Sequence, residues 1–303
     1  MRFAHALLIV ATMATVARAD EPKRDPDASL GQMFHGPFQS SRLFAMPTAD
    51  VIGAYMLSLS GDGSLLQQPG VLTSAGVIAI GFGDIAQLEY RHTGAISVTG
   101  VDAPVPAVGV QLHVPIPEHA YVPGLGVAVR IGVPRYEHFA ATTIEEKVTD
   151  FYFVARERLA PWFVLHAGVR VSPSTFTLTN DPAQPDVTLK RTLALPTAGL
   201  EIVMNPDARI VAEVAAVPQF MWMANGGEPP SIGYGMLARL GLRWKLVPSV
   251  IFDGSLGYQL ETADAQAGGG PRNIVQQWDI RLGAEVFVPW GALACRALGV
   301  FCD

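Results

Sequence analysis

The chain has 303 residues, of which half are hydrophobic and only 16% are charged. No segment after the N-terminus approaches the roughly 18 consecutive apolar residues that a transmembrane helix needs, and the net charge of −6 offers no basic surface for nucleic acid. The hydrophobic residues form short runs interspersed with 30 Gly and 23 Pro, which predicts many short strands joined by turns. The phosphate-binding glycine loops and CxxC pairs of common soluble enzymes are absent from the sequence.

The first 19 residues have the features of a secretory signal peptide. They comprise a short basic start, an apolar run and an Ala-Arg-Ala sequence at 17–19, which is typical of a signal-peptidase cleavage site. We expect cleavage after Ala19, with a short membrane anchor as the alternative. No Cys follows the site, so lipoprotein processing is not indicated.

Residues 20–48 are polar, contain proline and show no periodicity, and we expect them to form a flexible periplasmic lead-in. From residue 49 to residue 290 apolar and polar residues alternate, which is typical of strands with two different faces. The sequence predicts about twelve strands in one domain, near 50–60, 72–82, 84–92, 105–115, 123–133, 151–157, 161–171, 192–204, 208–220, 233–247, 250–261 and 278–290.

The predicted connections also alternate, between long polar segments and tight turns. The long ones lie near 61–71, 93–104, 135–148, 173–191, 221–232 and 262–274. An even number of antiparallel strands with short turns at one end and long loops at the other is the plan of a bacterial outer-membrane barrel. We therefore predict an all-β fold, a single closed antiparallel barrel.

The last strand indicates which face points inward. Residues 278–290 read WDIRLGAEVFVPW, so one face is apolar from Trp278 to Trp290 and the other is mostly charged. Tilted by about 45°, thirteen residues span about 28 Å, close to the apolar thickness of an outer membrane. A soluble barrel with the apolar face inside is the alternative, but twelve strands enclose more space than Ala, Val and Leu side chains fill. In the membrane orientation, the expected interface aromatics are Trp278, Trp290, Tyr234, Trp244 and Tyr258.

These features together resemble the bacterial outer-membrane β-barrel superfamily over residues 49–290. The resemblance implies an outer-membrane location, contact with outer-membrane lipid, insertion by the barrel assembly machinery and no cofactor. It departs from the superfamily at its end, where chains usually stop at the terminal aromatic of the last strand. Here GALACRALGVFCD follows Trp290, and we expect residues 291–303 to form a periplasmic tail.

The predicted lumen face carries charges of both signs. The candidate lumen residues are Arg130, Arg170, Arg209, Arg239, Arg243, Arg281, Glu201, Glu213, Asp253, Asp279 and Glu285. They have two interpretations. In the first, the barrel is a narrow, weakly anion-selective channel for small polar solutes. In the second, the side chains interlock and plug the barrel, which then acts structurally or binds partners through its extracellular loops.

An outer-membrane hydrolase is a third, weaker hypothesis. His113 and His166 fall on the predicted lumen face, but no Gly-x-Ser-x-Gly motif is present and no spacing brings a Ser, a His and an acid together. The histidines are too scattered to predict a metal site. We therefore expect that the protein is not an enzyme.

The two cysteines, Cys295 and Cys302, lie in the predicted tail. In an oxidising compartment they are expected to form a disulfide that closes a short loop. Two free thiols on a small apolar segment are the alternative.

Overall fold

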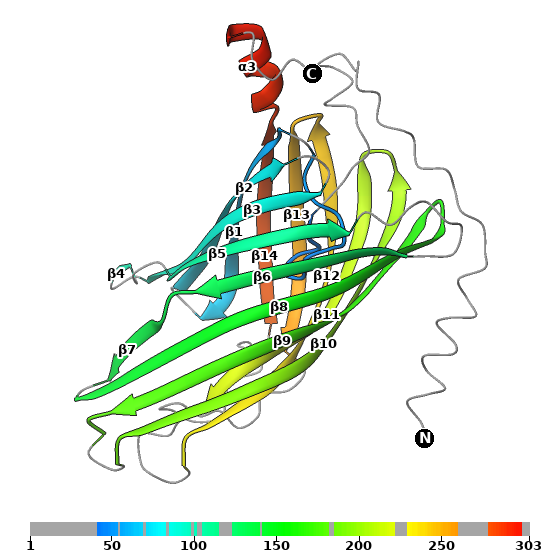
Figure 1. Cartoon of the computed structure of the whole chain (residues 1–303). Helices are drawn as coiled ribbons and strands as arrows, with labels where there is room; N and C mark the ends of the chain where they lie inside the picture. The colour runs from blue at the N-terminus through cyan, green and yellow to red at the C-terminus, as the bar shows by residue number, and fades with distance from the viewer. Residues whose placement is uncertain are drawn as a thin grey trace, which may run out of the picture.

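A computed structural model describes residues 41–53, 55–68, 71–82, 85–97, 100–101, 105–114, 123–139, 141–181, 185–221, 229–259 and 278–298. Over these residues the protein is an antiparallel β-barrel (Figure 1). The predicted signal peptide and residues 20–40 lie outside the described residues.

Twelve strands form the closed wall of the barrel among the described residues, in chain order around it, and β14 pairs with β1 to complete it. These strands are β1 (Leu57–Gln68), β2 (Val71–Phe82), β3 (Ala86–Ser97), β5 (Val105–Val114), β6 (Gly124–Gly132), β8 (Thr142–Ala160), β9 (Phe163–Thr179), β10 (Val187–Asn205), β11 (Ala208–Met221), β12 (Ser231–Val247), β13 (Val250–Gln259) and β14 (Trp278–Val288). Two short strands, β4 (Gly100–Val101) and β7 (Arg135–Phe139), pair with β3 and β8. The predicted fold class is confirmed.

Alternation along β12 fixes the orientation of the wall. Leu240 and Leu242 are 58% and 44% exposed, whereas Arg239 and Arg243 are 5% and 1% exposed. The apolar face therefore points outward and the charged face points into the lumen. An exposed apolar band around a whole barrel is unfavourable in water but matches the hydrocarbon core of a membrane.

Several strands are longer than the sequence pattern predicts. Only two residues separate β1 from β2, so the predicted loop at 61–71 is mostly strand. β8 and β10 have 19 residues each, about twice what a membrane crossing needs, and they absorb much of the loops predicted at 135–148 and 173–191. The middle of β1, with its small polar residues, lacks the apolar face that marks a strand in the sequence, although its backbone pairs normally with β2.

The long ends of β8, β9 and β10 project from the barrel at the end opposite to the helix α3 (Trp290–Leu298) (Figure 1). β10 pairs with β11 only from Thr197 onward, so the end of the β11–β12 hairpin separates from β10. The end of this hairpin instead contacts the projecting parts of β8, β9 and β10 through an apolar cluster. The buried members of this cluster are Ile144, Phe176, Leu178, Leu193, Leu195, Ala216 and Ile232.

The C-terminal tail begins with α3, which is described to Leu298. No helix in the described part of the chain is long and apolar enough to cross a membrane. The Trp290 ring packs edge-on against Tyr55, with 5.5 Å between the ring centroids, and the Gly291 amide donates to the Tyr55 carbonyl. Cys295 is disulfide-bonded, whereas Cys302 lies outside the described residues, so their pairing stays a prediction.

Candidate functional site: the occluded lumen

Residues 41–52, which we call the plug segment, lie among the inward-facing side chains of the barrel. The structure thus differs from the expected lead-in over residues 41–48, which are fixed against the wall by hydrogen bonds. They form a tight hairpin in which the Leu43 amide donates to the Met46 carbonyl and the Thr48 amide donates to the Ser41 carbonyl, both at 2.9 Å. Leu43 and Met46 are buried in a cluster with Ala128, Tyr152, Val154 and Val211 of the wall.

Glu213 of β11 holds the tip of this hairpin. The backbone amides of Phe44, Ala45 and Met46 donate to its Oε2 at 3.0, 3.0 and 3.2 Å. Three successive N–H groups converging on one oxygen form an anion-binding concavity, and hydrogen bonds to an ionised carboxylate are stronger than neutral ones. The buried Glu213 carboxylate is therefore satisfied by the plug segment itself.

Two arginines bind the carbonyl oxygens of the same hairpin. Arg243 of β12 donates from Nη1 to the Arg42 carbonyl at 2.9 Å and from Nη2 to the Leu43 carbonyl at 2.6 Å. Its Nε donates to Asp253 at 2.7 Å. Arg130 of β6 donates to the Ala45 carbonyl at 2.9 Å and pairs with Glu89 at 2.6 Å. Each arginine thus holds both a carboxylate of the wall and a peptide group of the plug segment.

Two glutamines, which the sequence reasoning missed, hold the rest of the plug segment. Gln111 Nε2 lies 3.0, 2.9 and 2.6 Å from the carbonyl oxygens of Ser41, Thr48 and Asp50. Gln87 Oε1 accepts from the Ile52 amide at 3.0 Å. Both glutamines occupy lumen positions of predicted strands, so their alternation was the available signal. Without a charge, the two glutamines could not be told from the other side chains of that face.

The predicted lumen residues all lie on the inner face and all have polar partners. Besides the contacts above, Arg170 binds Asp150 through two hydrogen bonds at 2.7 and 2.8 Å. The other pairs are Arg209 with Glu201 at 2.6 Å, Arg239 with Asp279 at 2.5 Å, Arg281 with Asp62 at 3.2 Å and with Asp279 at 2.8 Å, and Glu285 with Ser58. Wall and plug segment together interlock across the lumen.

The predicted interface aromatics fall into two groups at different levels of the barrel. Trp244, which is opposite Phe252 in the register, lies near the short turns and is exposed. Tyr234, Tyr258 and Trp278 lie toward the other end, where the Tyr258 and Trp278 rings are 4.7 Å apart. Trp290 is the exception, because β14 ends at Val288 and Trp290 begins α3 instead of ending the strand.

The two lumen histidines are used as structural hydrogen-bond partners. His166 Nε2 lies 3.0 Å from Glu201, whose other oxygen binds Arg209, and His113 Nδ1 lies 2.9 Å from the Ala49 carbonyl. Within the described ranges no serine is hydrogen-bonded to a histidine. The same residues contain no group of His, Cys, Asp and Glu side chains that could hold a metal ion.

Known proteins resemble the chain in fold and not in sequence. No family model matches the chain, and no curated protein matches it in sequence. Among solved structures it is similar to an outer membrane channel from Pseudomonas putida F1, with a TM-score of 0.53 and 9% identity over 82% of this chain and 99% of that chain.

Two further solved structures are similar at lower TM-scores. The KdgM porin has a TM-score of 0.46 and 11% identity, over 76% of this chain and 98% of that chain. The translocator domain of the autotransporter NalP from Neisseria meningitidis has a TM-score of 0.44 and 12% identity, over 76% and 86%. At such identities the likeness to the Pseudomonas channel concerns the fold. In fold, the chain is a closed antiparallel β-barrel similar to that channel.

Proposed function

We propose that the protein is an outer-membrane channel for small polar solutes and that the plug segment closes its lumen. The main support for this proposal is that Glu213 and Arg243 form hydrogen bonds with the backbone of residues 42–46. Side chains of the wall occupy the donors and acceptors of a peptide segment inside the barrel, where a solute would otherwise pass. The exposed apolar outer face supports the outer-membrane location.

The polar contacts of the plug segment can break without leaving the arginines of the wall unpaired. Arg243 and Arg130 keep Asp253 and Glu89 as partners when the segment leaves, so the wall retains its main ion pairs. Glu213 loses three backbone donors, but it lies opposite Arg239 in the register of β11 and β12. A wall whose ion pairs persist without the plug segment is compatible with an open state, in which Leu43 and Met46 leave their apolar cluster.

Conductance of the reconstituted protein in a planar bilayer tests the proposal. We expect low or rare conductance for the wild type and a clear increase for Glu213→Ala, because this variant removes the acceptor for three amides of the plug segment. Asp150→Asn is the matched control, since Asp150 is a lumen carboxylate that binds Arg170 and Ser172 and not the plug segment. It should leave conductance at the wild-type level.

The competing function is a permanently closed barrel that binds a partner at its projecting end. The apolar cluster around Phe176 and the long ends of β8–β10 favour it, because they build a rigid platform outside the membrane. A folded Glu213→Ala protein that remains silent in the bilayer would support this second function and contradict the channel. Folding of each variant is checked by the change in gel mobility on heating in detergent.

A further inference from the structure

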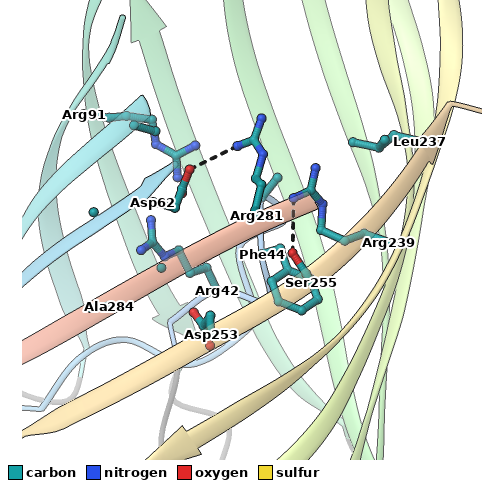
Figure 2. A pocket seen from close by; sticks show the side chains of 14 residues that line it. Arg42, Phe44, Asp62, Arg91, Leu237, Arg239, Asp253, Ser255, Arg281 and Ala284 are labelled. Carbon is teal, nitrogen blue, oxygen red and sulfur yellow. Dashed lines mark hydrogen bonds and ion pairs between the residues drawn. The ribbon is translucent and has the colours of Figure 1, made fainter. Parts of the chain in front are cut away.

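A cavity of about 130 Å³ lies beside the tip of the plug segment, between it and β1, β2, β3, β12, β13 and β14. Its charged lining consists of four arginines and two aspartates (Figure 2). They are Arg42, Arg91, Arg239, Arg281, Asp62 and Asp253. Arg42 comes from the plug segment and the others come from the wall, so both parts of the molecule build the cavity.

The carboxylates at this cavity are already engaged. Asp62 binds Arg281 at 3.2 Å, and Asp253 binds Arg243 at 2.7 Å, which lies outside the lining. Glu89, two residues from Arg91 on the same face of β3, binds Arg130 at 2.6 Å. The cavity therefore has more cationic groups than carboxylates to neutralise them.

Two of the arginines have buried donors without an acceptor. Arg91 Nε and Nη2, together with Arg239 Nε, are buried without a hydrogen-bond partner, although Arg239 is held by Asp279 through Nη2 at 2.5 Å. A buried guanidinium donor without an acceptor is unfavourable, and more so beside other cations. Both side chains line the same cavity, so a group placed there lies next to two arginines that are not fully hydrogen-bonded.

We propose that this cavity binds a small oxyanion, a phosphate, sulfate or carboxylate group. The planar fork of an arginine matches such groups with two parallel hydrogen bonds, and the cavity has room for one group of this size. This proposal rests on the closed lumen of the proposed function, because Arg42 belongs to the plug segment. A bound oxyanion joins the plug segment to the wall and stabilises the closed state.

Titration calorimetry of the detergent-solubilised full chain with inorganic phosphate tests the site. We expect saturable binding by the wild type, at least tenfold weaker binding by Arg91→Gln, and unchanged binding by Arg191→Gln. Arg191 carries the same charge on β10 but bonds to the Ile232 carbonyl, away from this cavity. Chloride at equal ionic strength should give no saturable heat.

Absence of saturable binding by the wild type would overturn the proposal, as would equal weakening by Arg91→Gln and Arg191→Gln. If Arg91→Gln does not fold, Arg91→Lys provides the comparison, since it keeps the charge and loses the fork. Wild-type affinity in Arg91→Lys would then count against the site. Because calorimetry needs no conduction, phosphate binding by a protein that stays silent in bilayers would overturn the channel and leave the site standing.

Discussion

Single positions in the lumen show how tightly the plug segment fits the wall. At Gly126 an added Cβ would lie 2.7 Å from the Cα of Ala49, and at Gly199 it would lie 2.1 Å from Leu43 Cδ1. Both glycines face the plug segment. They provide room for a second layer of chain inside the barrel, which a lumen lined throughout by larger side chains would not offer.

A substitution at Gly126 should therefore open the barrel without damaging the wall. In Gly126→Ala the new methyl group meets the backbone of the plug segment, with Ala49 Cα at 2.7 Å and the Ala49 and Thr48 carbonyl oxygens at 3.2 Å. The plug segment must move, and we expect higher conductance in a planar bilayer. Gly124→Ala is the control on the same strand face, because its Cβ has no neighbour closer than 3.8 Å. Equal conductance of the two variants would show that Gly126 does not limit the position of the plug segment.

Alternation in the sequence predicted the charged lumen residues, whereas nothing in the sequence predicted the plug contacts. Arg239 and Arg243 could be placed because alternation along β12 separates two faces, and that property is local. The partners of these residues could not be predicted, because the hydrogen bond from Arg243 to Leu43 spans 200 residues. Gln87 and Gln111 carry no charge, so nothing in the sequence distinguished them from ordinary lumen fillers.

Strands of this barrel were predictable where one face meets lipid and the other meets the lumen. β12 has this contrast along most of its length, whereas β1 reads LSLSGDGSLLQQ, with small residues, SGDGS, on both faces of its middle. The outer halves of β8, β9 and β10 have an apolar face, but it is buried in the cluster around Phe176 instead of lying on the outside of the barrel. Tertiary pairing with neighbouring strands, which satisfies the backbone, determines these regions.

The lipid-facing side of β12 gives a test of depth in the membrane. Leu240→Arg places a charge midway along an exposed apolar face and should destabilise the barrel by about 2 to 4 kcal/mol. Leu246→Arg makes the same change on the same face of β12, but near its short-turn end, and should cost only about 0 to 1 kcal/mol. Reversible unfolding in a lipid bilayer measures both. Equal losses at the two positions would contradict the placement of the membrane around β12.

Helix α3 contains Cys295, which we predict to form a disulfide with Cys302. Alkylation of the unreduced protein followed by mass analysis should find no free thiol. The disulfide closes a loop of only a few residues, so reduction should affect the tail alone and leave the heat-dependent gel mobility of the barrel unchanged. Two alkylated cysteines in unreduced protein would eliminate the bond.

In the whole molecule, the positive and negative side chains of the barrel wall nearly balance one another around the plug segment. Arg170 with Asp150, Arg209 with Glu201 and Arg243 with Asp253 are pairs within the wall, and close pairs of opposite sign largely cancel their field at a distance. The exception is the cavity beside the plug segment, where Arg91 has donors without partners. Any selectivity of an open lumen should therefore be weak and should depend on this region.

Reversal potentials of the opened channel test this distribution of charge. In a potassium chloride gradient, Glu213→Ala should show a small preference for anions, because a positive excess in the lumen raises their local concentration. Adding Arg91→Gln should move the reversal potential toward zero, since it removes a lumen cation whose neighbouring carboxylate, Glu89, is already paired with Arg130. Adding Arg191→Gln instead should change it less, because Arg191 lies near the outer end of β10, where its side chain is exposed. Clear cation selectivity in Glu213→Ala would mean that acidic residues at the entrance, and not the arginines of the wall, control which ions enter.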